Sequence, residues 1–146
     1  MGLRYAVNTH RNRWVFLRSF GIIYILEEII MNKMKNLIQK HERVWFYLKD
    51  LQTKRKFVQE ANAMGCCYLN GEPITLDNCY HIMALHSDCR LAQVKIYIWN
   101  VSFDGAVITP PPLRVDYAKF TAGAEDWECT RSSFGTIQLP MSMTKN

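Results

Sequence analysis

TKRKFVQEANAMG, residues 53–65, carries the clearest helical pattern in this 146-residue chain. Its apolar residues recur at helical spacing and form one stripe: Phe57, Val58, Ala61 and Met64. Asp50 or Thr53 offers the side-chain oxygen that caps a helix start, and Gly65 tolerates the positive φ that often ends a helix. The sequence therefore predicts a helix over residues 53–64.

Short segments rich in aromatic and β-branched residues surround this helix and predict strands. They are RVWFYLK (43–49), CCYLNG (66–71), YHIMALH (80–86), LAQVKIYIWNVSF (91–103), AVIT (106–109) and, as a strand or a turn, LRVDYAKF (113–120). The first of them also fits a continuation of a short helix expected over residues 32–42. Turn signals such as Asn70-Gly71 and Asp104-Gly105 make the connections short. We therefore predict an α+β fold, in which an antiparallel sheet of three to five strands packs against one main helix after an N-terminal helical extension.

Residues 91–103 form the strongest predicted strand, because aliphatic and other side chains alternate along it. The alternation places three residues on the face opposite the aliphatic row: Lys95, Tyr97 and Trp99. Cationic and aromatic side chains on an open sheet face can stack on bases or anchor a protein partner. The alternative is that the amino-terminal segment or the tail covers this face, because an open tryptophan face is costly in water.

Positive charge is concentrated in one part of the chain. Residues 31–56 hold eight basic and two acidic residues, whereas residues 57–146 hold six basic and nine acidic residues, within a total net charge of +5. Lys54, Arg55 and Lys56 sit at the start of the predicted helix, where free N–H groups also favour phosphate. This basic front is either a binding surface for phosphates or an acidic protein, or an ordinary solvated face.

The amino-terminal region raises the question of where the natural product starts. FGIIYIL, residues 20–26, is too short to span a membrane, and Glu27-Glu28 follow it in place of a signal-peptide cleavage site. Leu26-Glu27-Glu28 can be encoded by a purine-rich stretch resembling a bacterial ribosome-binding site before Met31. Residues 1–30 are accordingly expected to be a translated leader, or else an amphipathic helix covering the core. Residues 31–128 are expected to form one domain and residues 129–146 a weakly structured tail.

Residue patterns that would indicate catalysis or metal binding are weak. Cys79, His81, His86 and Cys89 are zinc-ligand types, but a regular strand places His86 on the opposite face from Cys79 and His81. The adjacent residues His86-Ser87-Asp88 do not indicate a triad, because triad groups converge from separate chain positions. The chain contains no phosphate-binding loop, no G-x-G-x-x-G and no G-x-S-x-G. We therefore expect no enzyme activity, no metal and no cofactor.

The five cysteines indicate a compartment. Their number is odd and Cys66 and Cys67 are adjacent, which does not match a disulfide framework. A reducing cytoplasm is expected, without membrane attachment.

Four segments together resemble small proteins carried by phages and conjugative elements of Firmicutes, over roughly residues 44–128. They are VWFYLKD, KRKFVQEANAMGCCYLNGEPI, HIMALHSDCRLAQVKIYIW and LRVDYAKF. The resemblance implies a mobile-element setting and no particular activity. Small proteins of such elements often bind a host macromolecule, as anti-CRISPR and anti-restriction inhibitors do.

The resulting hypothesis is a non-enzymatic protein that binds and inhibits or modulates a host protein or ribonucleoprotein machine, with a CRISPR nuclease as one candidate. The expected contact residues are Lys54, Arg55, Lys56, Lys95, Tyr97 and Trp99. The alternative is a small nucleic-acid-binding protein that uses its basic N-terminal face.

Overall fold

The computed structural model describes residues 19–131, with side chains from residue 28 onward. The elements, in chain order, are α1 (Ser19–Lys40), β1 (Arg43–Tyr47), α2 (Leu51–Ala63), β2 (Cys67–Tyr68), β3 (Ile82–His86), β4 (Arg90–Gln93), α3 (Ile96–Val101), β5 (Leu113–Asp116) and α4 (Tyr117–Ala122). A helix precedes a five-stranded sheet, so the predicted α+β class is confirmed.

The chain divides into two compact units, Met1–Lys35 and Asn36–Asn146, with the division inside α1. Helix α1 runs without interruption through Met31, so the helix expected over residues 32–42 belongs to a longer helix that ends at Lys40. Residues 1–18 of the expected leader lie outside the described residues. The expected leader, domain and tail boundaries remain predictions.

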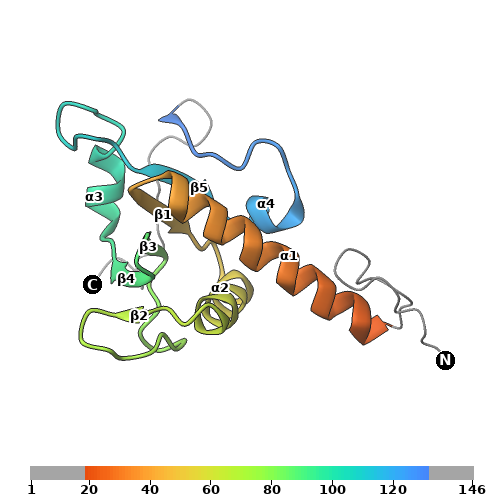
Figure 1. Ribbon diagram of the computed structural model, residues 1–146. Helices are drawn as coiled ribbons and strands as arrows, with labels where there is room; N and C mark the ends of the chain where they lie inside the picture. Colours follow the sequence, from red (N-terminus) through yellow and green to blue (C-terminus); the bar gives the residue numbers. More distant parts are fainter. Residues whose placement is uncertain (1–18, 132–146) are drawn as a thin grey trace. The chain divides into compact units, whose positions relative to one another are not determined.

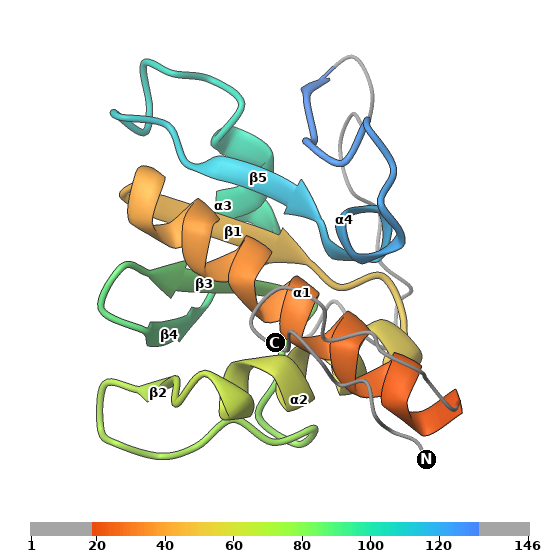
Figure 2. The same cartoon turned by 45° about the vertical axis from the view of Figure 1, so that its right-hand side comes forward.

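The second unit is built on a sheet with the strand order β2-β4-β3-β1-β5, which Figure 2 shows edge to edge. β1 pairs antiparallel with β3, and β3 pairs antiparallel with β4. The prediction of a purely antiparallel sheet is wrong, because β5 returns to lie parallel to β1 and β2 lies parallel to β4. Each parallel pair joins strands separated by other elements, which short hairpin connections cannot provide.

Helices cover both faces of this sheet (Figure 1). On one face, Phe46 of β1, Phe57 of α2 and Tyr117 of α4 form a ring cluster with centroid distances of 5.2 to 5.6 Å. On the other face, Trp45 of β1 and Trp99 of α3 belong to a second buried cluster. Because successive side chains of β1 point to opposite faces of the sheet, this strand contributes to two separate apolar layers.

The helix and turn chemistry around α2 follows the predictions. Asp50 is the N-cap, and Gly65 follows the helix with φ +78°. Gly71 adopts φ +88° in the predicted Asn70-Gly71 turn, where its N–H donates to the Tyr68 carbonyl over 2.8 Å. The three-residue connection between β3 and β4 ends at Cys89, a non-glycine residue with φ 66°.

Two strand predictions are wrong. The strand expected over residues 91–103 ends at Gln93, and the chain then forms α3. The edge strand expected over residues 106–109 is a series of turns, in which the Val107 N–H donates to the Asp104 carbonyl over 3.0 Å.

The outer edge of β5 is occupied by residues 127–129. The Asp116 N–H donates to the Trp127 carbonyl, and the Cys129 N–H donates to the Arg114 carbonyl, each over 2.8 Å. Cys129 is buried. The first residue of the expected weakly structured tail is thus fixed at the sheet edge, and residues 132–146 lie outside the described residues.

Candidate polyanion-binding groove

The N-terminus of α2 is closed by its own capping residue. One carboxylate oxygen of Asp50 accepts hydrogen bonds from the Thr53 N–H over 2.8 Å and from the Thr53 hydroxyl over 2.6 Å. These bonds favour the ionised form and hold the pKa of the Asp50 carboxyl below its ordinary value. A first-turn N–H that we expected to favour phosphate is therefore already taken, and binding of an anion here depends on side chains.

The helix separates the three predicted basic residues of this segment. Arg55 and Lys56 are exposed and line a hollow between α2 and α4. Lys54 is half-buried and lies toward His81, whose pKa is lowered by burial first and also by the Lys54 charge. Adjacent helix positions are about 100° apart around the axis, so three consecutive residues cannot all point into one groove.

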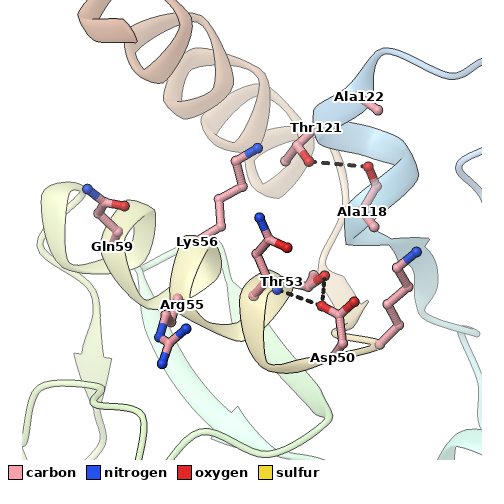
Figure 3. A pocket seen from close by; sticks show the side chains of 10 residues that line it. Asp50, Thr53, Arg55, Lys56, Gln59, Ala118, Thr121 and Ala122 are labelled. Carbon is pink, nitrogen blue, oxygen red and sulfur yellow. Dashed lines mark hydrogen bonds between the residues drawn. The ribbon is translucent and has the colours of Figure 1, made fainter. Parts of the chain in front are cut away.

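We call this hollow the α2–α4 groove; its volume is about 500 Å³. It is lined by Lys49, Asp50, Gln52, Thr53, Arg55, Lys56, Gln59, Ala118, Thr121 and Ala122. Figure 3 shows α2 and the residues before it forming one wall, with α4 forming the other. Three cations and one carboxylate give the lining a formal net charge of +2.

The α4 wall consists of small residues, which leaves the groove open. Ala118 and Ala122 lie one helical turn apart, and Thr121 lies beside them. The Thr121 hydroxyl donates to the Tyr117 carbonyl over 3.0 Å and so bonds its own helix (the Ala118 carbonyl, at 3.3 Å, is a second acceptor; Figure 3). Lys119 of the same helix is not a lining residue and pairs with Asp126 at 2.9 Å. The positive charge of the groove thus comes from α2 and from Lys49.

The structure corrects the predicted binding face of residues 95–99. Lys95 is the N-cap of α3, Tyr97 is 61% exposed, and Trp99 is 0% exposed. Trp99 packs against Tyr47 and Phe103, each with a centroid distance of 6.1 Å. In a helix, residues two positions apart point in different directions, so the predicted row of Lys95, Tyr97 and Trp99 does not exist as one open face. Their roles in binding remain predictions.

Two of the four candidate zinc-ligand residues, Cys79 and His81, are buried. Burial raises the pKa of the Cys79 thiol to about 11. His81 is buried, and its Nδ1 donates to the Leu48 carbonyl over 2.9 Å. Across the described part of the chain, no three His, Cys, Asp or Glu side chains are grouped as ligands for a metal ion.

Two contributors to the groove escaped the sequence-based prediction. Lys49 belongs to the basic front of residues 31–56, but its place directly before the Asp50 cap gives no sequence signal for a binding site. The α4 wall carries no local sequence signal, because Ala118 and Thr121 are ordinary helix residues. Only the return of β5 beside β1 brings α4 next to α2.

No protein-family model, curated protein or solved structure matches the chain. None of the helices within residues 19–131 has the length and hydrophobicity needed to cross a bilayer.

Proposed function

We propose that this protein acts without catalysis, by binding and thereby inhibiting or modulating a macromolecular machine of a host cell. A CRISPR nuclease is one candidate, consistent with the resemblance to proteins of phages and conjugative elements. The α2–α4 groove is the proposed contact surface. Host protein or ribonucleoprotein complexes present the negatively charged surfaces that such a groove complements.

The net positive lining of the α2–α4 groove is the observation that carries this proposal. Lys49, Arg55 and Lys56 are all exposed, so each ammonium or guanidinium group is available to a partner. Asp50 is the one carboxylate of the lining, and as the N-cap of α2 it already accepts hydrogen bonds from the N–H and the hydroxyl of Thr53. Complementary charge accelerates association and excludes partners of like charge.

The states of the buried thiols also support a binding role. A nucleophilic cysteine requires a lowered pKa and access to a substrate. Burial instead raises the pKa of Cys79 to about 11 and that of Cys129 to about 12. Both thiols are buried in the fold, and this arrangement favours structural positions over reactive ones.

The test is a functional assay of a host machine, combined with purification of the complex. A bacterial strain with active CRISPR immunity is challenged with a targeted plasmid, while it expresses the wild-type protein, Arg55→Glu or Lys56→Glu. Arg90→Glu is the matched control, because Arg90 is exposed and does not line the groove. Lys95→Glu tests whether α3 makes the contact instead.

We expect the wild-type protein to protect the plasmid and to purify with the nuclease in a fixed ratio. The groove variants should lose both properties, whereas Arg90→Glu should retain them. Loss in Lys95→Glu alone would move the contact surface to α3. If neither plasmid targeting nor a parallel restriction assay is affected by the wild-type protein, the proposal of a defence inhibitor is refuted.

The alternative proposal is that the chain binds nucleic acid directly and has no protein target. The same basic groove supports it. Plasmid protection separates the two proposals, because a chain that only binds nucleic acid leaves CRISPR targeting intact. Treating the purification with nuclease then shows whether a partner is held through protein or only through nucleic acid.

A further inference from the structure

The lining of the α2–α4 groove contains cations and amides but no large apolar side chain. Its apolar members are Ala118 and Ala122 alone. Tight protein–protein interfaces depend on buried aromatic or large aliphatic anchors at their centre, and arginine acts there beside them. The groove offers no pocket of that kind to an acidic protein.

Binding of a phosphate backbone requires much less than a protein interface does. Lysine and arginine side chains neutralise phosphates without an apolar anchor, and arginine can contact two phosphate oxygens at once. Amide side chains add contacts to phosphate or sugar oxygens, and the groove carries Gln52 and Gln59 on the α2 wall. The lining therefore matches the chemistry of a sugar–phosphate chain.

We infer that the α2–α4 groove binds the phosphodiester backbone of a nucleic acid, through Lys49, Arg55 and Lys56 and without reading its sequence. This inference rests on the proposed use of the groove as the contact surface, and it assigns the contact to the nucleic acid of the host machine. Sequence independence is expected, because contacts of these cations to phosphate oxygens carry no sequence information.

The number of phosphate contacts predicts how steeply the binding constant falls with salt concentration. Three phosphate contacts predict a slope of about −2 for log K against log salt with a single strand. Raising the salt from about 50 to about 200 mM should then weaken binding roughly 20-fold. Removal of one cation should reduce the slope by about 0.7, so that the same change of salt weakens binding only about sevenfold.

The experiment is fluorescence anisotropy of the full chain with labelled single-stranded oligonucleotides of two unrelated sequences, and with a duplex. Lys56→Gln removes one cation from the groove, and Arg90→Gln removes one exposed cation outside it. Asp50→Asn removes the one carboxylate and keeps an efficient capping residue. Polyglutamate serves as the competitor that represents an acidic protein.

We expect equal affinity for the two sequences and the salt slope above. Lys56→Gln should lower both affinity and slope, Arg90→Gln should change neither, and Asp50→Asn should raise affinity. Comparison of the single strand with the duplex shows which form supplies the backbone. The inference is overturned if polyglutamate competes as well as unlabelled oligonucleotide, or if Lys56→Gln and Arg90→Gln behave alike. Absence of binding at low salt, together with groove-dependent protection in the plasmid assay, would also overturn it while the proposed function survives.

Discussion

Tyr97 and Trp99 provide a direct test of α3, because they are aromatic residues only two positions apart. Trp99 is fully buried, with its ring 6.1 Å from the ring centroids of Tyr47 and Phe103. Tyr97 is 61% exposed. A strand through this segment would place both side chains on one face, and truncation of either would then have a similar effect.

The helix predicts very different losses of stability. Replacement of a fully buried tryptophan by alanine removes its burial and leaves a cavity, which costs about 3 to 5 kcal/mol. Replacement of an exposed residue such as Tyr97 changes stability by about 0.5 kcal/mol or less. The total free energy of unfolding of an ordinary domain is about 5 to 15 kcal/mol. Trp99→Ala should therefore remove a large part of the stability, whereas Tyr97→Ala should leave it intact.

Urea unfolding followed by far-ultraviolet circular dichroism measures both variants. With a urea dependence of about 1.5 kcal/mol per M, Trp99→Ala should lower the unfolding midpoint by about 2 to 3 M. Trp99→Phe retains a large ring, should fall between the two, and provides a measurement if the alanine variant does not fold. Equal midpoints for Tyr97→Ala and Trp99→Ala would refute the placement of the two side chains on different sides of α3.

The remaining predictions concern the β3–β4 turn, a buried histidine and a half-buried arginine. Cys89→Gly should raise the free energy of unfolding by about 0.5 to 1 kcal/mol, because Cys89 has φ 66°, a conformation that glycine adopts without strain. Cys89→Ala keeps the strain and is the control. Burial lowers the pKa of His81 below its ordinary 6.5, so the unfolded chain takes up a proton first, and stability should fall as the pH drops below that value. The difference between the urea midpoints near pH 7.5 and pH 5 should be smaller for His81→Gln than for the wild type. An unchanged difference would contradict this prediction. Arg114→Gln should lower the free energy of unfolding by about 2 kcal/mol, because the guanidinium donates to the Ser102 carbonyl at 2.9 Å and lies 4.1 Å from the Phe103 ring centroid. Thermal unfolding measures the loss, and a loss no larger than that of Arg90→Gln would count against these contacts.

Local signals were sufficient for α2, β1 and β3. The cap at Asp50, the apolar stripe through Phe57 and the glycine at position 65 lie within one short segment, and each acts on its neighbours in the chain. β1 was correctly preferred over a continued helix, because its aromatic and branched residues pack on both sides of a central strand.

Segment 91–103 shows where local signals fail. Its alternation of aliphatic and polar residues matches a strand, yet Ile96 and Trp99 are also one helical turn apart. In α3, Trp99 packs into a buried cluster with Trp45 and Ile82. This cluster joins residues that are far apart in the chain, so a local pattern does not reveal it. The same limit applies to the groove, whose α4 wall is positioned by the β1–β5 pairing.

The parallel pairing of β1 with β5 also has a consequence for synthesis on the ribosome. Val44 and its neighbours leave the ribosome long before their partners at Leu113 and beyond. Until β5 arrives, one edge of a mostly apolar central strand is open to other chains. Contacts of this separation in sequence form slowly, because a long loop must close first. A nascent chain stalled before residue 113 should therefore be the species that recruits chaperones or aggregates, and its release from this state should coincide with the addition of β5.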